Sequence, residues 1–140
     1  MAVDTHLLVR NWLLSVSQIT AMVGTGNINN GIYCGDLPES FTPSSGLGIQ
    51  ILASGGSSHP EILTVDDDKK MIRVWAGKNE YLKAHQLYTL IKSALHGATN
   101  LDFSASGYVM RCLEIIAAQD VTDPETGWAT VVSFYNLMAR

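Results

Sequence analysis

Apolar residues recur every three or four positions along two segments of the chain. The first segment, Asp4–Val23, begins with a polar residue that can cap a helix, and Gly24 follows it as a stop. The second segment, Glu80–Leu95, is followed by Gly97, which suits a left-handed helix end. Both segments are predicted to be amphipathic helices. Their expected buried residues are Leu8, Trp12, Val16, Ile19 and Val23 in the first helix, and Ala84, Leu87, Tyr88, Ile91 and Leu95 in the second.

Shorter apolar stretches, some of them alternating with polar residues, predict β-strands. We expect Ser54–Pro60 to be a loop and Asp66–Lys70 to be the turn of a hairpin. The stretch Asp123–Gly127 has Asp, Pro and Gly at the positions that a tight turn favours. The predicted strands are Gly31–Cys34, Gly48–Ala53, Ile62–Val65, Met71–Ala76, Val109–Ala118 and Ala129–Met138.

The order of these elements is α-β-β-β-β-α-β-β. Helices do not alternate with single strands, so a parallel nucleotide-binding sheet is disfavoured. We therefore expect an α+β fold, with a single mainly antiparallel sheet and two helices packed on one face. The chain has 140 residues and is expected to form one domain, 1–140.

Composition narrows the class of protein further. The chain is 46% hydrophobic and 16% charged, which excludes a disordered tail and favours burial in an oligomer. Its net charge is −4 and its basic residues are scattered, so direct DNA binding is not expected. Cys34 and Cys112 form no CxxC motif and are expected to be reduced, half-buried thiols. Neither a signal peptide nor a membrane span is evident.

The stretch Met22–Gly31, MVGTGNINNG, resembles a phosphate-binding loop only in its glycines. Here a helix leads in and a strand leads out, so the negative end of the helix dipole faces the loop and would repel phosphate. His85 and His96 share a helix face but lie about 16 Å apart at 1.5 Å per residue, too far to share a metal. Adjacent Asp66–Asp68 lacks the ligand spacing of a calcium loop. We expect no enzyme, no cofactor and no metal.

Aromatic residues near charged or turn positions suggest a surface role. Trp75 follows Arg73 on a predicted strand, and Trp128 directly follows the predicted turn. Together with Tyr135, these residues fit a domain that has both a core and a packed subunit interface.

Three groups of motifs resemble the small tail-terminator proteins of long-tailed bacteriophages. The chain opens with a helix ending in ITAMVG, followed by the strand IY and the turn CGDLPE. Later come MIRVWAG and the helix YLKAHQLYTLIKSAL, and the chain closes with DPETGWATVVSFYNLMAR. The likeness spans nearly the whole chain.

This resemblance implies a structural virion protein that caps the tail tube as a ring, usually a hexamer. Such a protein stops tail polymerisation and provides the surface for head joining. Its implied partners are further copies of itself, the tail tube protein and a head connector or stopper protein. DNA passes through the lumen without specific binding, and no membrane is involved. The implied location is the virion, assembled in the bacterial host cytoplasm.

A ring requires a heterologous interface, in which two different patches of each subunit meet. We expect it at exposed strand edges and around Arg73, Trp75, Trp128 and Tyr135. Turns that face the tube or connector are expected to supply the axial contacts, along with the Gly55–Pro60 loop. Their candidate residues are Asp36, Pro38, Glu39, Asp66, Asp67, Asp68, Asp123 and Glu125.

Two alternatives remain open. A head-closure or adaptor protein of the same virion neck would share the size, fold class and ring symmetry, but it would bind on the portal side. A small ligand-binding or enzymatic α+β domain would instead have a deep pocket with convergent polar groups and shifted pKa values.

Overall fold

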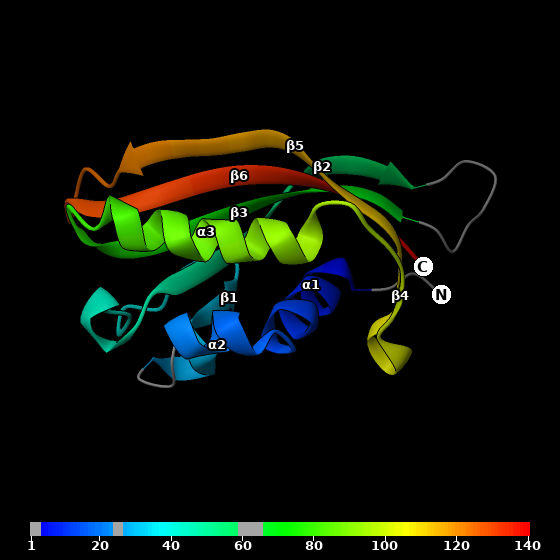
Figure 1. Ribbon diagram of the computed structural model, residues 1–140, viewed down its shortest axis with the longest axis horizontal. Coiled ribbons are helices and arrows are strands. Elements are labelled where there is room, and N and C mark those ends of the chain that lie inside the picture. The colour runs from blue at the N-terminus through cyan, green and yellow to red at the C-terminus, as the bar shows by residue number, and fades with distance from the viewer. Residues whose placement is uncertain (1–3, 24–26, 59–65) are drawn as a thin grey trace.

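The computed structural model describes residues 4–23, 27–58 and 66–140. In these ranges the chain forms a six-stranded sheet in the order β1-β2-β3-β6-β5-β4 (Figure 1). β1 and β2 are parallel, and every other neighbouring pair is antiparallel. The strands are β1 (Ile32–Cys34), β2 (Gly48–Ser58), β3 (Asp66–Lys78), β4 (Ala98–Asp102), β5 (Tyr108–Thr122) and β6 (Trp128–Ala139). The α-helices are α1 (Thr5–Leu14), α2 (Ser17–Val23) and α3 (Tyr81–Leu95), with 3₁₀ turns at Ile28–Gly31, Pro43–Ser45 and Ser104–Ser106.

All three α-helices lie on the same side of the sheet (Figure 1). The main core lies between them and the sheet, and it joins helix residues such as Leu8 and Leu87 to strand residues such as Ile51, Ile72 and Val131. The α+β class with a single, mainly antiparallel sheet is therefore confirmed. The expected number of helices, two, and the expected order of elements along the chain differ from those described.

The helix predicted at Glu80–Leu95 is confirmed as α3, with Glu80 as the residue before its first turn. Its buried residues are the five expected from the periodicity: Ala84, Leu87, Tyr88, Ile91 and Leu95. The apolar stripe of the helix therefore determines which face packs on the sheet.

The helix predicted at Asp4–Val23 is divided into α1 and α2. Asp4 caps α1 by accepting a hydrogen bond from the Leu7 N–H, as expected. At Ser15 the hydroxyl donates to the Trp12 carbonyl, and such local hydrogen bonds compete with helix continuation. The break still leaves Leu8, Trp12, Ile19 and Val23 buried, with Val16 only partly so. Gly24, the predicted stop, lies outside the described residues.

The prediction of a hairpin turn at Asp66–Lys70 is wrong. These residues form the first part of β3, which pairs with β2 on one side and with β6 on the other. Lys70 is buried and forms an ion pair with Asp68 at 3.7 Å. Asp68 also accepts a hydrogen bond of 2.6 Å from Thr5. Pairing on both edges and these polar contacts accommodate charged residues that look like a solvated turn in the sequence.

The remaining differences concern the edges of the sheet. β2 continues to Ser58, through part of the predicted loop, with Gly55 at positive φ beside a register shift. β4 is not predicted because its residues, ATNLD, are mostly polar and exposed. The described strands are therefore three before α3 and three after it, not four and two. The predicted strand Ile62–Val65 lies outside the described residues.

Candidate functional site

Five side chains from four separate segments form a second apolar cluster, which we call the aromatic corner. It consists of Tyr33, Leu37, Phe41, Trp75 and Trp128. The rings meet edge to face: Phe41 lies 5.7 Å from Trp128, and Trp128 lies 6.2 Å from Trp75, between ring centroids. Such T-shaped pairs are the favoured geometry of aromatic rings. The corner therefore joins the loop after β1 to the ends of β3 and β6.

Two polar residues beside the corner lie on the sheet face away from the helices. The Trp75 indole N–H donates to the Gln50 side-chain oxygen at 3.0 Å, and the Gln50 amide donates to the Gly35 carbonyl at 2.7 Å. The Arg73 guanidinium lies over the Trp75 ring, 4.4 Å from its centroid. Burial lowers the pKa of Arg73, and the Asp123 carboxylate opposes that shift.

The turn predicted at Asp123–Gly127 is confirmed and borders the corner. The Asp123 carboxylate accepts from the Thr126 N–H at 3.0 Å and from the Thr126 hydroxyl at 2.6 Å. These hydrogen bonds, with a smaller contribution from Arg73, lower the pKa of Asp123. Gly127 adopts φ +74°, which closes the turn before Trp128.

A hollow of about 300 Å³ opens between this turn and the loop after β1. It brings together predicted subunit-interface residues and predicted partner-contact residues. Of the first kind, Trp75 and Trp128 line it. Four predicted partner-contact residues also line it: Pro38, Glu39, Asp123 and Glu125. Arg73 lies beside it against Trp75.

Asp36 lies in a different hollow, of about 450 Å³, between α1 and β1. There the Cys34 thiol donates to the His6 carbonyl oxygen at 3.6 Å, and the His6 imidazole takes no part in that contact. Burial lowers the pKa of His6 and raises the pKa of Cys34. A raised thiol pKa is the opposite of what an activated cysteine nucleophile requires.

Asp66, Asp67 and Asp68 lie at the opposite end of β3 from the aromatic corner. The ladder between β3 and β6 pairs Asp66 with Ala139 at one end and Lys78 with Trp128 at the other. The predicted contact residues are therefore divided between the two ends of the sheet strands.

Tyr135 differs from the other predicted interface residues. Its side chain is 1% exposed and belongs to the main core beneath the helices. Burial raises the pKa of its hydroxyl. Tyr135 therefore has no side-chain surface to offer a neighbouring subunit in this conformation.

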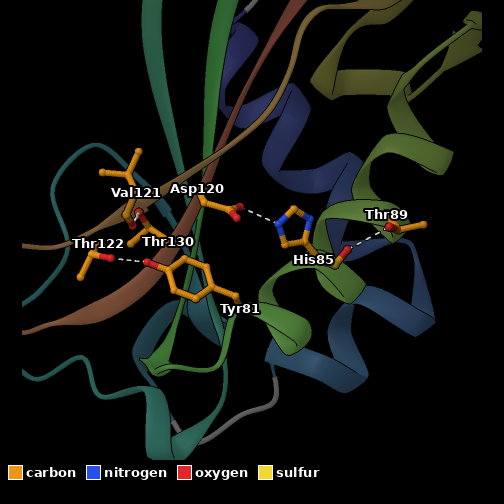
Figure 2. Close-up of polar contacts among 7 residues, drawn as sticks. All are labelled: Tyr81, His85, Thr89, Asp120, Val121, Thr122 and Thr130. Carbon is orange, nitrogen blue, oxygen red and sulfur yellow. Dashed lines mark hydrogen bonds and ion pairs between the residues drawn. The ribbon is translucent and has the colours of Figure 1, made fainter.

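A row of polar contacts joins α3 to β5 (Figure 2). The Tyr81 hydroxyl contacts Thr122, and His85 contacts Asp120 at 2.5 Å. Further along α3, Tyr88 donates to the Glu114 carboxylate at 2.6 Å, and its pKa is raised to about 12 by burial and by this carboxylate. His85 and His96 thus have structural contacts, the latter accepting from the Glu114 N–H.

Within the described ranges, no group of His, Cys, Asp or Glu residues is arranged to hold a metal ion. None of the helices in the same ranges combines the length and apolar character needed to cross a membrane. Both described cysteines are free, Cys34 exposed and Cys112 buried, so neither is half-buried as expected.

Leu37, Phe41 and Gln50 belong to this region but are not among the residues predicted from sequence. Leu37 and Phe41 stand out as large apolar side chains in an otherwise polar loop, which is the available signal. The ring of Phe41 packs against Gly48, where any Cβ would lie 2.6 Å from it. That contact joins segments that no sequence periodicity connects.

No protein-family model and no curated protein matches the sequence. Among solved structures, a chain of the virion of the native gene transfer agent (GTA) particle matches with a TM-score of 0.64. The match covers 94% of this chain and 90% of that chain, at 16% sequence identity. At this identity the likeness establishes a shared fold.

Proposed function

We propose that this chain is a structural protein of a phage-type virion and, more narrowly, a tail terminator. In this role it caps the tail tube as a ring, stops tube growth and provides the surface for head joining. The observation that carries the proposal is the fold likeness to a chain of the gene transfer agent virion, which runs over 94% of this chain. The motif resemblance to tail terminators points to the same class of protein.

The distribution of candidate surfaces supports an assembly role. The aromatic corner with Pro38, Glu39, Asp123 and Glu125 lies at one end of the strands, and Asp66–Asp68 lies at the other. A protein between two unlike partners needs two unlike ends. We therefore assign one end to the tail tube protein and the other to the head connector or stopper, with further copies alongside in a hexameric ring.

The chemistry of the hollows supports a role without catalysis. In the larger hollow the pKa of the Cys34 thiol is raised rather than lowered, and its contact is a backbone carbonyl. Covalent catalysis would require a nucleophile beside a base that is oriented by a third group. The proposed location is accordingly the virion, assembled in the host cytoplasm, with DNA passing through the lumen unbound.

The test is light scattering over a concentration series, on the protein alone and then with polymerising tail tube protein. We expect a closed hexamer, or a monomer that becomes a ring on tube ends, and tubes that stop growing once capped. Tube length measured by electron microscopy should fall as the ratio of this protein to tube protein rises.

A monomer that leaves tube length unchanged at every ratio would contradict the terminator assignment. Binding to portal-side protein instead of tubes would point to a head-closure or adaptor protein of the neck. Bovine serum albumin at equal concentration controls for crowding in the tube assay.

A further inference from the structure

One side of the sheet ends in a long strand edge with little cover. β4 pairs with β5 only over Tyr108–Cys112, and beyond it the Glu114 N–H is capped by the His96 ring. From residue 115 to residue 122, β5 pairs with β6 on one side, and no strand within the described ranges lies on its other side. This part of β5 forms that side of the molecule in Figure 1. Ile115, Ile116 and Val121 are 47%, 43% and 39% exposed along this edge.

The other side of the sheet has a free edge at the opposite end. β1 pairs with β2 only over Ile49–Ile51, so residues 52–58 of β2 have no second neighbour in the described part of the chain. On each side of the sheet, therefore, a short outermost strand pairs with only part of the longer strand next to it. The rest of that longer strand has an open edge.

Measured along the strand direction, the short outer strand on each side of the sheet lies at the same position as the open edge on the other side. The pairing can be followed residue by residue across the sheet. Tyr33 of β1 is aligned with Gln119, which lies in the open part of β5; the residues between them are Gln50 in β2, Arg73 in β3 and Val132 in β6. In the other direction, Ala98 of β4 is aligned with Gly56, which lies in the open part of β2; the residues between them are Cys112 in β5, Leu137 in β6 and Asp68 in β3. The short strand on each side thus lies opposite the gap on the other side.

Strand direction also agrees. β2, β3, β6 and β5 alternate in direction, so β5 of one copy would run antiparallel to β1 of a copy placed beside it. β4 is antiparallel to β5, so it would run parallel to β2 of that copy. An exposed sheet edge can take an added strand, and antiparallel pairs are the commoner kind. Unpaired strand edges that carry aliphatic side chains are pairing sites unless they are covered.

The edge of β1 has room for such a neighbour. The Gly35 N–H donates to the Ile51 carbonyl, so Ile32 and Cys34 direct their backbone groups away from β2. Arg10 Nε already binds the Ile32 carbonyl at 3.2 Å, which leaves Cys34 facing outward. The hollow of about 450 Å³ beside it includes exposed Leu7, an apolar surface on the helix side of this edge.

We infer that the occupant of the open β5 edge is β1 of a second copy of this chain, with β4 filling the gap beside β2 of that copy. The contact is heterologous, because each copy uses both of its sides, and repetition can close a ring. This inference rests on the proposed function for the choice of a ring over a two-fold pair. The sheet then continues from copy to copy around the ring.

Disulfide trapping tests the register with a cysteine that the chain already has. Cys34 is level with Ile51, Ile72 and Ser133, and Ser133 lies between the partners of Ile116 and Gln119. Ala117 and Ala118 therefore lie opposite Cys34 of the neighbour, and Ala117 is the exposed one of the two. The variant Ala117→Cys, oxidised after assembly on tube ends, should give a ladder of covalent oligomers ending at the ring size. Mass spectrometry of the digested oligomers should find the peptide that contains Cys34 linked to the peptide that contains the substituted position.

Three controls separate the outcomes. Leu82→Cys places a thiol at an α3 position that is 75% exposed and belongs to neither strand edge, and it should give no ladder. Ala117→Cys with Cys34→Ser should also give none; a dimer there would show that β5 pairs with itself and would overturn the inference. Circular dichroism checks that each variant is folded.

Light scattering measures whether a ring forms, independently of which strands pair. It therefore distinguishes failure of this inference from failure of the proposed function. A ring of the Ala117→Cys variant that forms on tubes without the expected disulfide to Cys34 would overturn the edge pairing and leave the terminator role standing. Absence of any ring would overturn both. As a second variant, Ile116→Lys should weaken association at least tenfold, whereas Leu82→Lys should leave it unchanged.

Discussion

At the scale of single residues, Gln50 connects the aromatic corner to the backbone. It accepts the only hydrogen bond found for the Trp75 indole N–H in the described structure and donates its own amide proton to the Gly35 carbonyl. Both Gln50 and Trp75 are buried. A buried donor that loses its partner costs more than the hydrogen bond itself contributed, because water cannot replace it.

Gln50→Ala should therefore lower the free energy of unfolding by about 1–3 kcal/mol. Urea denaturation followed by tryptophan fluorescence measures the change. Gln119→Ala, at an exposed position of β5, is the matched control and should change stability by less than about 0.5 kcal/mol. Equal effects of the two substitutions would contradict the role assigned to Gln50.

Asp123 gives a prediction about pH. Its folded pKa is lowered, so its contribution to stability is complete above the unfolded value, about 3.9, and is lost as pH falls through the folded value. Wild type should exceed Asp123→Asn in unfolding free energy at pH 7, and the difference should shrink towards pH 2. Paired urea denaturations at the two pH values measure it.

Glu125→Gln is the control for Asp123, since it removes a charge from the same turn and keeps the Thr126 hydrogen bonds. A difference between wild type and Asp123→Asn that stays constant from pH 7 to pH 2 would contradict the assigned cause of the pKa shift.

Some single residues are predictable from sequence and others are not. Asp123 and Gly127 indicate their turn because side-chain hydrogen bonding and positive φ are local properties. Trp75 and Trp128 stand out in the sequence, but the partner that joins them, Phe41, comes from a loop 34 residues before Trp75. Contacts of that separation depend on the whole fold.

At the scale of elements, the polar contacts between α3 and β5 differ in solvent exposure, and exposure determines how much each contact contributes to stability. His85 and Asp120 lie 2.5 Å apart, but their side chains are 41% and 55% exposed. Glu114, which Tyr88 and Lys92 contact, is nearly buried at 7%. Solvent screens the interaction between His85 and Asp120 strongly, and it screens the contacts of Glu114 much less.

A double-mutant cycle on His85→Ala and Asp120→Ala should give a coupling energy below about 1 kcal/mol. The same cycle on Tyr88→Phe and Glu114→Gln should give a larger one, because the carboxylate there is buried. Thermal or urea unfolding of the four variants in each cycle measures both. The reverse order of the two coupling energies would contradict this account.

Elements are predictable where burial repeats with a period. The five buried residues of α3 follow helical spacing, so the sequence identifies them directly. The acidic start of β3 looks like a turn, but a strand paired on both edges accepts charges when side chains such as Thr5 bind them. β4 escapes prediction because an exposed edge strand leaves no apolar alternation to detect.

At the scale of the whole molecule, the sheet separates two kinds of surface. The helices cover one face, and the aromatic corner covers only one end of the other. The outer face between the edges keeps partly buried apolar residues, among them Leu52, Met71 and Phe134. The candidate axial contact residues lie at or just beyond the ends of the strands, where the proposed partners above and below would meet the molecule.

The sheet order has a consequence for biosynthesis. β6 follows every other strand in sequence, yet it lies between β3 and β5 and is what joins β1-β2-β3 to β5-β4. A nascent chain that has emerged from the ribosome only as far as β5 has two half-sheets with open edges towards each other. Such edges are prone to aggregation, and pairing over long sequence separations is slow. Folding must therefore be completed after translation of β6, and a chaperone holding the nascent chain would act in that interval.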